Sequence, residues 1–230
     1  MYNWILKLKL LINLMKYRGV FLKKQYSKNK EDQYLKKIFK NKNNGTYLDI
    51  GAYHPYRFSN TYLLYKKGWS GINVDINKES VDLFNIARPN DTNLNIAIGD
   101  KNKMQTFYYK KKRHPMNTLN KEFAKSYFYT KKTPIDKSRI MMRTFDYLIK
   151  NLKNIDLLDI DVEGNEYDVI KKINFKKIRF KIILIEHSHF NEKAKKNTKK
   201  IKYLLLKKNY KHIKNLGETS VYKNKINYIN

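Results

Sequence analysis

The stretch Thr46-Tyr47-Leu48-Asp49-Ile50-Gly51-Ala52-Tyr53-His54-Pro55 decides the fold of this chain. Its first five residues suit a buried β-strand, and an acid lies next to the end of that strand. Gly51 then permits a sharp turn of the backbone and the close approach of a ligand. In open α/β sheets, ligands bind outside the carboxyl ends of the strands, where such turns lie. We therefore interpret residues 46–55 as a central strand followed by a ligand-binding turn.

Strands and helices alternate along the rest of the chain. Apolar runs predict strands at residues 72–76, 94–98, from 155 onward and at 182–187, with a closing hairpin at about 210–222. Helical patterns separate these strands. Such an alternation is typical of a mostly parallel sheet with right-handed crossovers. The sequence thus predicts an α/β fold.

Residues 101–140 interrupt this alternation. They contain a short predicted strand at 106–109, a cationic run at 110–113 and then an irregular aromatic stretch. Long segments of this kind inside a compact domain are usually functional or disordered. We interpret this one as a substrate lid inserted into a domain of residues 45–230, and residues 1–44 as an N-terminal helical extension.

Length and composition limit the class of protein. The chain has 230 residues, no cysteine and a formal net charge of +30. It is long enough for one domain with a sizeable core, and it can hold neither a disulfide framework nor a thiolate metal site. The charge favours loose binding to anionic surfaces. Because lysine far outnumbers arginine, which nucleic-acid readers prefer for base contacts, we attribute the charge to nucleotide bias. No specific nucleic-acid partner is predicted, and a polyanion partner stays the alternative.

The N-terminal residues 1–22 have an amphipathic pattern. On a helical wheel, one face carries the apolar side chains of Trp4, Leu8, Leu11, Ile12 and Met15. Lysines interrupt the run, which is too short to span a bilayer and shows no small-residue cleavage site. We interpret it as a helix packed on its own domain. The alternative is peripheral contact with an anionic membrane, so the expected location is the cytoplasm, including the inner membrane face.

Acids stand at or near the ends of four predicted strands. They are Asp49, Asp75, the group of Asp159, Asp161 and Glu163, and Glu186. Four acidic strand ends on one edge of a sheet suggest a single lined cleft. Asp75 follows the first turn at about the distance at which an acid meets ribose hydroxyls in dinucleotide-type folds. Since the chain lacks a G-x-G-x-x-G motif, we expect a nucleoside cofactor without a diphosphate, such as S-adenosylmethionine.

The third acidic group allows more than one interpretation. Asp159, Asp161 and Glu163 alternate, so on a strand they would point to the same face. Three such carboxylates can surround a divalent cation. Equally, two of them can contact a ligand while the third begins a helix. A D-x-D pair is also similar to the metal–nucleotide-sugar site of some glycosyltransferases, although that interpretation leaves the turn at Gly51 and the acid at Asp75 unexplained.

Several motifs occur in the order found in one enzyme family. They are Tyr26-Ser27 with Glu31-Asp32, the stretch 45–55, Phe58-Ser59-Asn60-Thr61, and the stretches 68–75, 95–100 and 155–166. Together, over about residues 26–190, they resemble the FkbM-type methyltransferase family. The most specific feature is the Asp-Val-Glu-Gly block at 161–164 downstream of the Asp-Ile-Gly-Ala block at 49–52.

The resemblance implies a fold, a cofactor and a set of contacts. The fold is a single Rossmann-like class I methyltransferase domain with seven strands, the last antiparallel, and helices on both faces. The methyl donor is S-adenosylmethionine. The implied cofactor contacts are Asp49, Gly51 and Ala52 at the methionine end, Asp75 at the ribose hydroxyls, Asp100 near adenine, and also Asn60, Ile76 and Asp159. Asp161 and Glu163 would face the methyl-transfer site. The second glycine that is usual in the turn of this class is replaced here by residues 53–55.

The predicted reaction is O-methylation of a hydroxyl on a glycan, a polysaccharide precursor or a related metabolite. A sugar hydroxyl is a poor nucleophile and benefits from a general base. The candidates for that base are Asp161, Glu163, His54 and His187. A divalent metal is compatible with this pattern but not implied by it. Two alternatives stay open: a metal-dependent glycosyltransferase that uses Asp159 and Asp161, and a nucleic-acid-binding protein or RNA methyltransferase, suggested by the charge.

Overall fold

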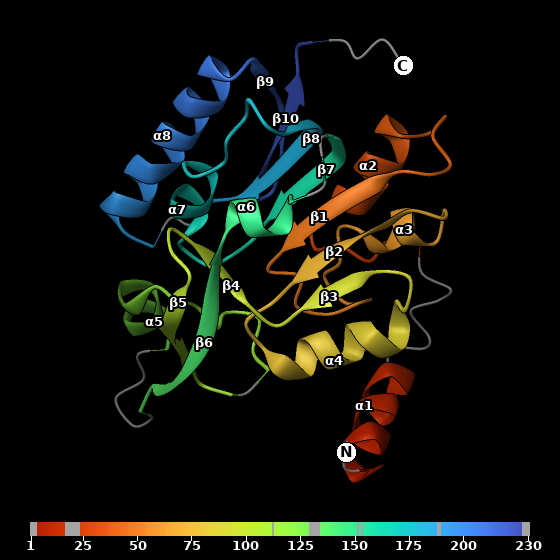
Figure 1. Cartoon of the computed structure of the whole chain (residues 1–230), viewed down its shortest axis with the longest axis vertical. Coiled ribbons are helices and arrows are strands. Elements are labelled where there is room, and N and C mark those ends of the chain that lie inside the picture. The colour runs from red at the N-terminus through yellow and green to blue at the C-terminus, as the bar shows by residue number, and fades with distance from the viewer. Residues whose placement is uncertain are drawn as a thin grey trace.

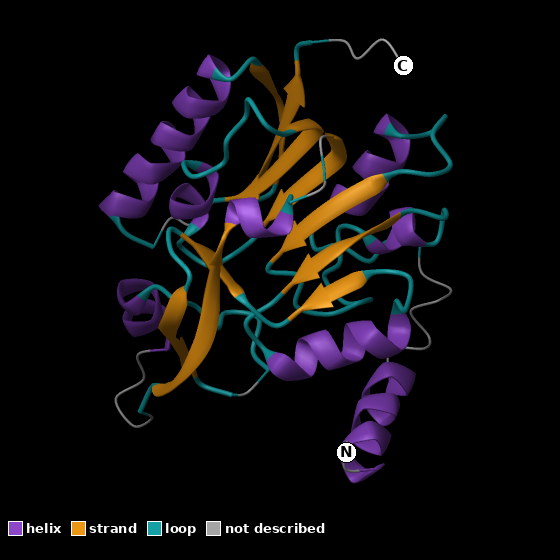
Figure 2. Ribbon diagram, viewed as in Figure 1, coloured by secondary structure: helices purple, strands orange, loops and turns teal. Residues whose placement is uncertain are grey.

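A computed structural model describes residues 4–16, 24–111, 113–128, 134–150, 152, 154–187 and 190–226 (Figures 1 and 2). Its helices are α1 (Trp4–Lys16), α2 (Glu31–Ile38), α3 (Tyr62–Tyr65), α4 (Lys78–Ala87), α5 (Lys121–Phe128), α6 (Phe145–Leu148), α7 (Glu166–Ile170) and α8 (Glu192–Lys207). Its strands are β1 (Thr46–Ile50), β2 (Ser70–Val74), β3 (Thr92–Leu94), β4 (Ala97–Gly99), β5 (Lys103–Tyr109), β6 (Asp136–Thr144), β7 (Asn154–Ile160), β8 (Arg179–Glu186), β9 (Tyr210–Leu216) and β10 (Thr219–Asn224).

The larger sheet has the strand order β3-β2-β1-β7-β8-β10-β9 within the described residues (Figure 1). The strand of the opening stretch, β1, lies inside this sheet and pairs in parallel with both β2 and β7. Only β10 is antiparallel to its neighbours, β8 and β9. This arrangement confirms the predicted α/β fold with a mostly parallel sheet of seven strands and a closing hairpin whose last strand is reversed.

Helices cover both faces of this sheet because the buried strands present apolar side chains to both sides. Successive residues of β1 show the alternation: Leu48 packs in the cluster that contains α7 and α8. Tyr47 packs on the opposite face, in the cluster of Leu35, Leu64 and Trp69. Because Leu35 belongs to α2, this part of the predicted N-terminal extension packs directly on the sheet.

The strand predicted at residues 94–98 is wrong as a single element. The chain forms two short strands instead, and they belong to different sheets. At the break, the side-chain amide of Asn95 donates to the carbonyl oxygen of Asp75, at 3.0 Å. The second strand, β4, then pairs in parallel with β6 in a smaller sheet of order β4-β6-β5.

The interrupted region at 101–140 contains more regular structure than its sequence indicates. Among the residues described there, β5 pairs antiparallel with β6, and α5 lies in the connection between them (Figure 2). The strand predicted at 106–109 is the second half of β5. The segment predicted to act as a lid therefore includes part of this small sheet.

The face by which α1 packs differs from the predicted one. Leu10 and Leu14 are buried in a cluster with Leu83 of α4, so the helix does pack on its own domain. The side chains of the predicted apolar face are exposed instead: Trp4, Leu8, Leu11, Ile12 and Met15. The reason is that this helix has apolar residues on more than one side, and α4 covers only one of them. No helix in the described ranges is both long and apolar enough to cross a membrane.

Candidate active site

The turn after β1 fits tightly against the end of β7. Gly51 has a φ of +93°, in the region that favours glycine. A Cβ atom at this position would lie 1.6 Å from the carbonyl oxygen of Asp161. The amide of Asp161 donates to the carbonyl of Ile50 at 2.9 Å, and the amides of Gly51 and Ala52 both donate to the carbonyl of Val74. The glycine thus lets three strand ends meet closely.

A pocket opens beside this turn, with about 510 Å³ of empty space including its mouth. It lies at the carboxyl ends of β1, β2 and β7, where the fold is expected to bind a ligand. Five of the predicted site residues line it: Gly51, Asp75, Ile76, Asp161 and Glu163. The other lining residues are Ile50, Val74, Asn77, Ile96, Ala97, Ile98, Pro115, Asn117, Leu119, Val162, Asn165 and Val169. Most of these are apolar, as is usual for a small-molecule site.

Asp75 is held firmly at the edge of the pocket. Its carboxylate accepts a hydrogen bond from the amide of Tyr53 at 2.8 Å, and two from the backbone and side-chain amides of Asn77 at 2.6 and 2.8 Å. Burial raises the pKa of Asp75 to about 6, although these hydrogen bonds oppose the shift. A carboxylate offers about four acceptor sites. Asp75 therefore keeps capacity for one further donor, such as a ligand hydroxyl.

Part of the inserted region lies across the pocket. Pro115, Asn117 and Leu119 all line it. The side-chain amide of Asn117 donates to the side-chain oxygen of Asn77 at 2.5 Å, and the hydroxyl of Thr118 donates to the carbonyl of Glu163 at 2.7 Å. These contacts join the segment to the ends of two strands. That this segment acts as a lid stays a prediction.

A second polar network lies behind the turn, outside the pocket lining. Asp49 accepts a hydrogen bond from the hydroxyl of Thr61 at 2.9 Å, and Asp159 accepts one from the side-chain amide of Asn60 at 2.9 Å. The two acids are neighbours in the register of β1 and β7. Burial raises the pKa of Asp49 to about 6 and that of Asp159 well above its usual range. The guanidinium of Arg88, fully buried here, opposes the shift at Asp49.

This network changes the interpretation of three predicted cofactor contacts. Asp49, Asn60 and Asp159 hold the loop after β1 to the sheet, and none of them lines the pocket. Ala52 is buried and also lies outside the lining. Asp100 is exposed and is not among the lining residues. The structure thus brings together the predicted ribose and methyl-transfer residues, but not the predicted adenine contact.

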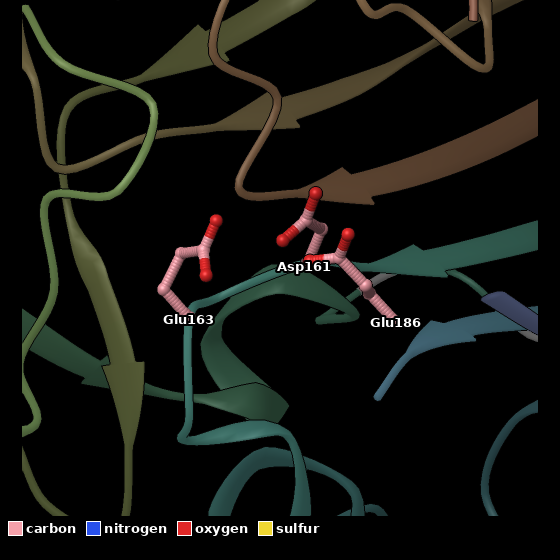
Figure 3. Close-up of side chains that lie close together, drawn as sticks. All are labelled: Asp161, Glu163 and Glu186. Atoms are coloured by element: carbon pink, nitrogen blue, oxygen red, sulfur yellow. The ribbon is translucent and has the colours of Figure 1, made fainter. Parts of the chain in front are cut away.

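Three carboxyl groups converge next to the pocket (Figure 3). Asp161, Glu163 and Glu186 each offer an oxygen, and these oxygens lie within 4.8 Å of one another. Burial and then the charge of Glu186 raise the pKa of Glu163 to about 9. Burial, Glu186 and Glu163 likewise raise the pKa of Asp161. From the sequence we grouped Asp159 with Asp161 and Glu163. In the structure the third member of the group is Glu186, the last residue of β8.

His54 does not have the surroundings of a general base. It is 1 % exposed. Its Nδ1 accepts hydrogen bonds from the amides of Tyr56 and Arg57, at 3.1 and 3.0 Å, and its Nε2 lies 3.2 Å from the side-chain oxygen of Asn13 in α1. Burial, followed by nearby arginines, lowers the pKa of His54 to about 3. Its ring therefore joins a loop to α1, and we withdraw the catalytic assignment.

This burial predicts a dependence of stability on pH. The pKa of His54 lies below the value of about 6.5 for an unfolded histidine, so only the unfolded state gains a proton as the pH falls below 6.5. We expect the free energy of unfolding to fall by about 2 kcal/mol between pH 7 and pH 5 from this residue. Urea unfolding of wild type and His54→Gln at both pH values measures it. An equal pH slope in the two proteins would contradict the prediction.

His187 also lies away from the pocket lining. Its backbone amide donates to the carbonyl of Glu218 at 2.8 Å, and its Nε2 contacts the hydroxyl of Ser220 in β10. It follows Glu186 directly, yet the structure places it against the closing hairpin. We therefore retain Asp161 and Glu163, but not His187, as candidates for the base.

Sequence reasoning missed three residues that shape the site. Asn77 and Asn117 connect the inserted segment to the end of β2, and Arg88 supports the loop after β1. Asn77 carried a usable signal, because it follows a strand-end acid and begins a helix. Asn117 lies in an irregular stretch, and Arg88 follows a helix among many other cations, so neither position stood out.

Known proteins show what this chain is similar to. No curated protein matches the sequence. Among solved structures, an O-methyltransferase from Bacillus cereus, in complex with SAH, is 13 % identical with a TM-score of 0.48, covering 93 % of this chain and 88 % of its own. A Klebsiella pneumoniae protein provisionally described as an O-methyltransferase is 10 % identical with a TM-score of 0.47, covering 94 % and 90 %. Residues 49–212 match the methyltransferase FkbM domain, which is most of the chain. The protein therefore belongs to the FkbM methyltransferase family.

Proposed function

We propose that this methyltransferase transfers the methyl group of S-adenosylmethionine to a hydroxyl of a glycan, a polysaccharide precursor or a related metabolite. The observation that carries the proposal is the pocket at the strand ends, where the Gly51 turn and Asp75 lie beside the acids of the Asp161–Glu163 turn. Family membership supplies the reaction class. The single-glycine turn suits a nucleoside ligand without a diphosphate.

Each group around the pocket has a distinct task in this proposal. When bound, the cofactor supplies a methyl carbon on positively charged sulfur; transfer forms a carbon–oxygen bond and leaves a neutral thioether. The carboxylate of Asp75 accepts a hydrogen bond from a ribose hydroxyl, and Gly51 leaves room for the methionine end. In its ionised form, the carboxyl group of Asp161 or Glu163 takes the proton that the acceptor hydroxyl loses. The lid segment around Asn117 restricts the entry of water.

The alternatives have less support from the geometry. A glycosyltransferase-type pair would need Asp159 and Asp161 at one ligand, but Asp159 is hydrogen-bonded to Asn60 and lies outside the pocket lining. A nucleic-acid substrate is suggested by the charge alone. The hydroxyl acceptor is preferred because acids, rather than cations, lie next to the pocket.

Calorimetric titration with S-adenosylhomocysteine, with and without magnesium, tests the proposal. We expect saturable binding at one site. The acceptor class is then tested with radiolabelled S-adenosylmethionine and pools of sugars, glycans and RNA. Absence of cofactor binding by folded protein would contradict the proposal, and transfer to RNA alone would replace its acceptor.

Replacing Asp75 with alanine tests the ribose contact. We expect the affinity for S-adenosylhomocysteine to fall by about tenfold or more, because a charge-assisted hydrogen bond contributes about 1.5–3 kcal/mol. The matched control is Asp168→Ala, which removes an exposed acid outside the pocket lining and should leave the affinity unchanged. Circular dichroism verifies the fold of both variants. Equal affinity in wild type and Asp75→Ala would remove the ribose role.

A further inference from the structure

We propose that Asp161, Glu163 and Glu186 bind a divalent cation at the edge of the pocket, and that this cation contacts the acceptor hydroxyl. The inference rests on the proposed function and names a requirement for its acceptor: a molecule that presents oxygen ligands, as neighbouring sugar hydroxyls do. Carboxylate oxygens are the ligands that magnesium, manganese and calcium prefer.

The first observation is the convergence of the three side chains. They come from two neighbouring strand ends, and Figure 3 shows their carboxyl groups pointing toward one another. One oxygen from each lies within 4.8 Å of the other two. Oxygens around a bound cation are separated by distances of this order, given metal–oxygen distances of about 2.0–2.6 Å.

The second observation concerns the partners of these groups. Glu163 is 8 % exposed, and its carboxyl group forms no hydrogen bond or ion pair with any residue in the described ranges. It points toward Asp161 and Glu186 (Figure 3). The Oδ1 atom of Asp161 is likewise out of solvent and without a hydrogen-bond partner in the described part of the chain. Asp161 shares a hydrogen bond with Glu186, but its Oδ1 atom has no such partner, and a carboxyl oxygen left in this way can serve as a ligand for a cation.

The surrounding protein does not supply the missing positive charge. Among the residues that the structure describes, no lysine, arginine or histidine forms an ion pair with any of the three acids. The charge of Lys28 reaches the group, but its ammonium pairs with Glu218 at 2.8 Å. Buried charges in proteins are normally paired or bound to a metal ion, and the described residues give these three acids no ion pair.

The position of the three acids beside the pocket would let a bound cation contact the acceptor. Asp161 and Glu163 line the pocket, and Glu186 is close to both but is not among the lining residues. A cation held here would bind an acceptor oxygen and make its proton easier to lose. The released proton would pass to a carboxyl oxygen or to water, and the oxygen would form the new bond to carbon. No oxidant or reductant is needed.

Manganese binding by the purified protein, without cofactor or acceptor, tests the inference. Electron paramagnetic resonance of free Mn²⁺ gives the affinity and number of sites. We expect one saturable site in wild type, and an affinity at least tenfold lower in Glu186→Gln. The matched control is Glu122→Gln, which neutralises an exposed acid of α5 and should leave binding unchanged.

The outcomes separate this inference from the proposed function. Glu186→Gln should fold, because it removes one of three crowded acids, and S-adenosylhomocysteine binding confirms that it does. Cofactor binding without manganese binding would overturn the metal site and leave the proposed function standing. Equal manganese affinity in wild type and Glu186→Gln would also overturn it. Metal binding without cofactor binding would support the site and contradict the function.

A separate observation concerns the exposed face of α1, and from it we propose that this helix binds the surface of an anionic membrane. The helix lies beyond α4 at one end of the molecule (Figure 1). Five large apolar side chains stand on its outer side, from Trp4, which is 72 % exposed, to Met15, which is 59 % exposed. Leu10 and Leu14 hold the opposite side to α4.

Charge decides in favour of a membrane as the occupant of this face. Lys9 and Lys16 are exposed on the same helix, and the whole chain carries +30. An apolar helix face with flanking lysines and a terminal tryptophan suits the interface of an anionic bilayer. A second copy of this chain would bring two strongly positive molecules together, which is unfavourable.

Sedimentation with vesicles tests this proposal. We expect the full chain to pellet with vesicles containing phosphatidylglycerol at least fivefold more than with phosphatidylcholine alone. A double variant, Leu8→Asn with Ile12→Asn, should lose most of this binding. Tyr203→Ser, which removes an exposed aromatic side chain of α8, is the control and should bind as wild type does. Unchanged vesicle binding by the double variant would overturn the proposal. It would also be overturned if the wild-type protein did not bind vesicles but formed a dimer that the double variant does not form.

Discussion

Replacing Gly51 with alanine is expected to abolish cofactor binding and to destabilise the protein by about 4 kcal/mol or more. The new Cβ would lie 1.6 Å from the carbonyl oxygen of Asp161, so backbone must move. In addition, a φ of +93° is costly for any residue with a Cβ. Asp161 follows β7 and lines the pocket, so displacing its backbone changes the shape of the pocket. Urea unfolding and titration with S-adenosylhomocysteine measure the two effects.

Gly68→Ala is the matched control for this prediction. Gly68 has almost the same backbone angle, a φ of +90°, but its nearest contact would be the side-chain oxygen of Asn44 at 3.0 Å. That side chain can move, so we expect only the conformational cost of about 1–2 kcal/mol. Cofactor affinity should be unchanged. If Gly51→Ala is no less stable than Gly68→Ala, the tight contact between the turn and β7 is not required.

Replacing Arg88 with leucine is expected to destabilise the protein by about 3–5 kcal/mol, as the loss of a buried ionic partner does. Its guanidinium donates to the hydroxyls of Thr61 and Ser59, both at 2.8 Å, and to the carbonyl of Pro55. It also lies over the ring of Phe84, at 4.9 Å. Without it, three acceptors lose a donor and Asp49 loses the nearby positive charge. Urea unfolding measures the change.

Arg57→Ala provides the control for the loss of an arginine from the same region. Arg57 is exposed and lies over the ring of Phe58 at 4.5 Å. We expect a change of about 1 kcal/mol or less, since an exposed cation–π contact contributes little. A similar loss of stability in the two variants would show that the buried network around Arg88 has no special weight.

The sequence predicted the sheet well because the signals for it are local. A strand such as β1 alternates between two buried faces, and its apolar residues are contiguous in the chain. The turn at Gly51 and the acids at the strand ends are also local features. Parallel strands bring their carboxyl ends to one edge, so the position of the pocket followed from the chain order alone.

Predictions failed where the outcome depends on contacts between distant segments. His54 lies beside the central turn in the sequence, and this proximity suggested that it acts as a general base. In the structure its ring is hydrogen-bonded to Asn13, 41 residues earlier. The helical wheel of α1 identified an apolar face, yet α4 covers the side that carries Leu10 and Leu14. A pattern within one element cannot show which of its sides a neighbour will cover.

The sequence by itself determined the α/β sheet, its central strand, and the edge of the sheet at which the pocket lies. Only the tertiary structure decided which acids share a site. Asp159 and Asp161 are two residues apart, but the strand keeps the first in the network of Asn60, while the turn brings the second to Glu186. The physical reason is that the alternation of side chains along a strand depends only on consecutive residues. Which strand-end residues meet depends instead on the register between β7 and β8.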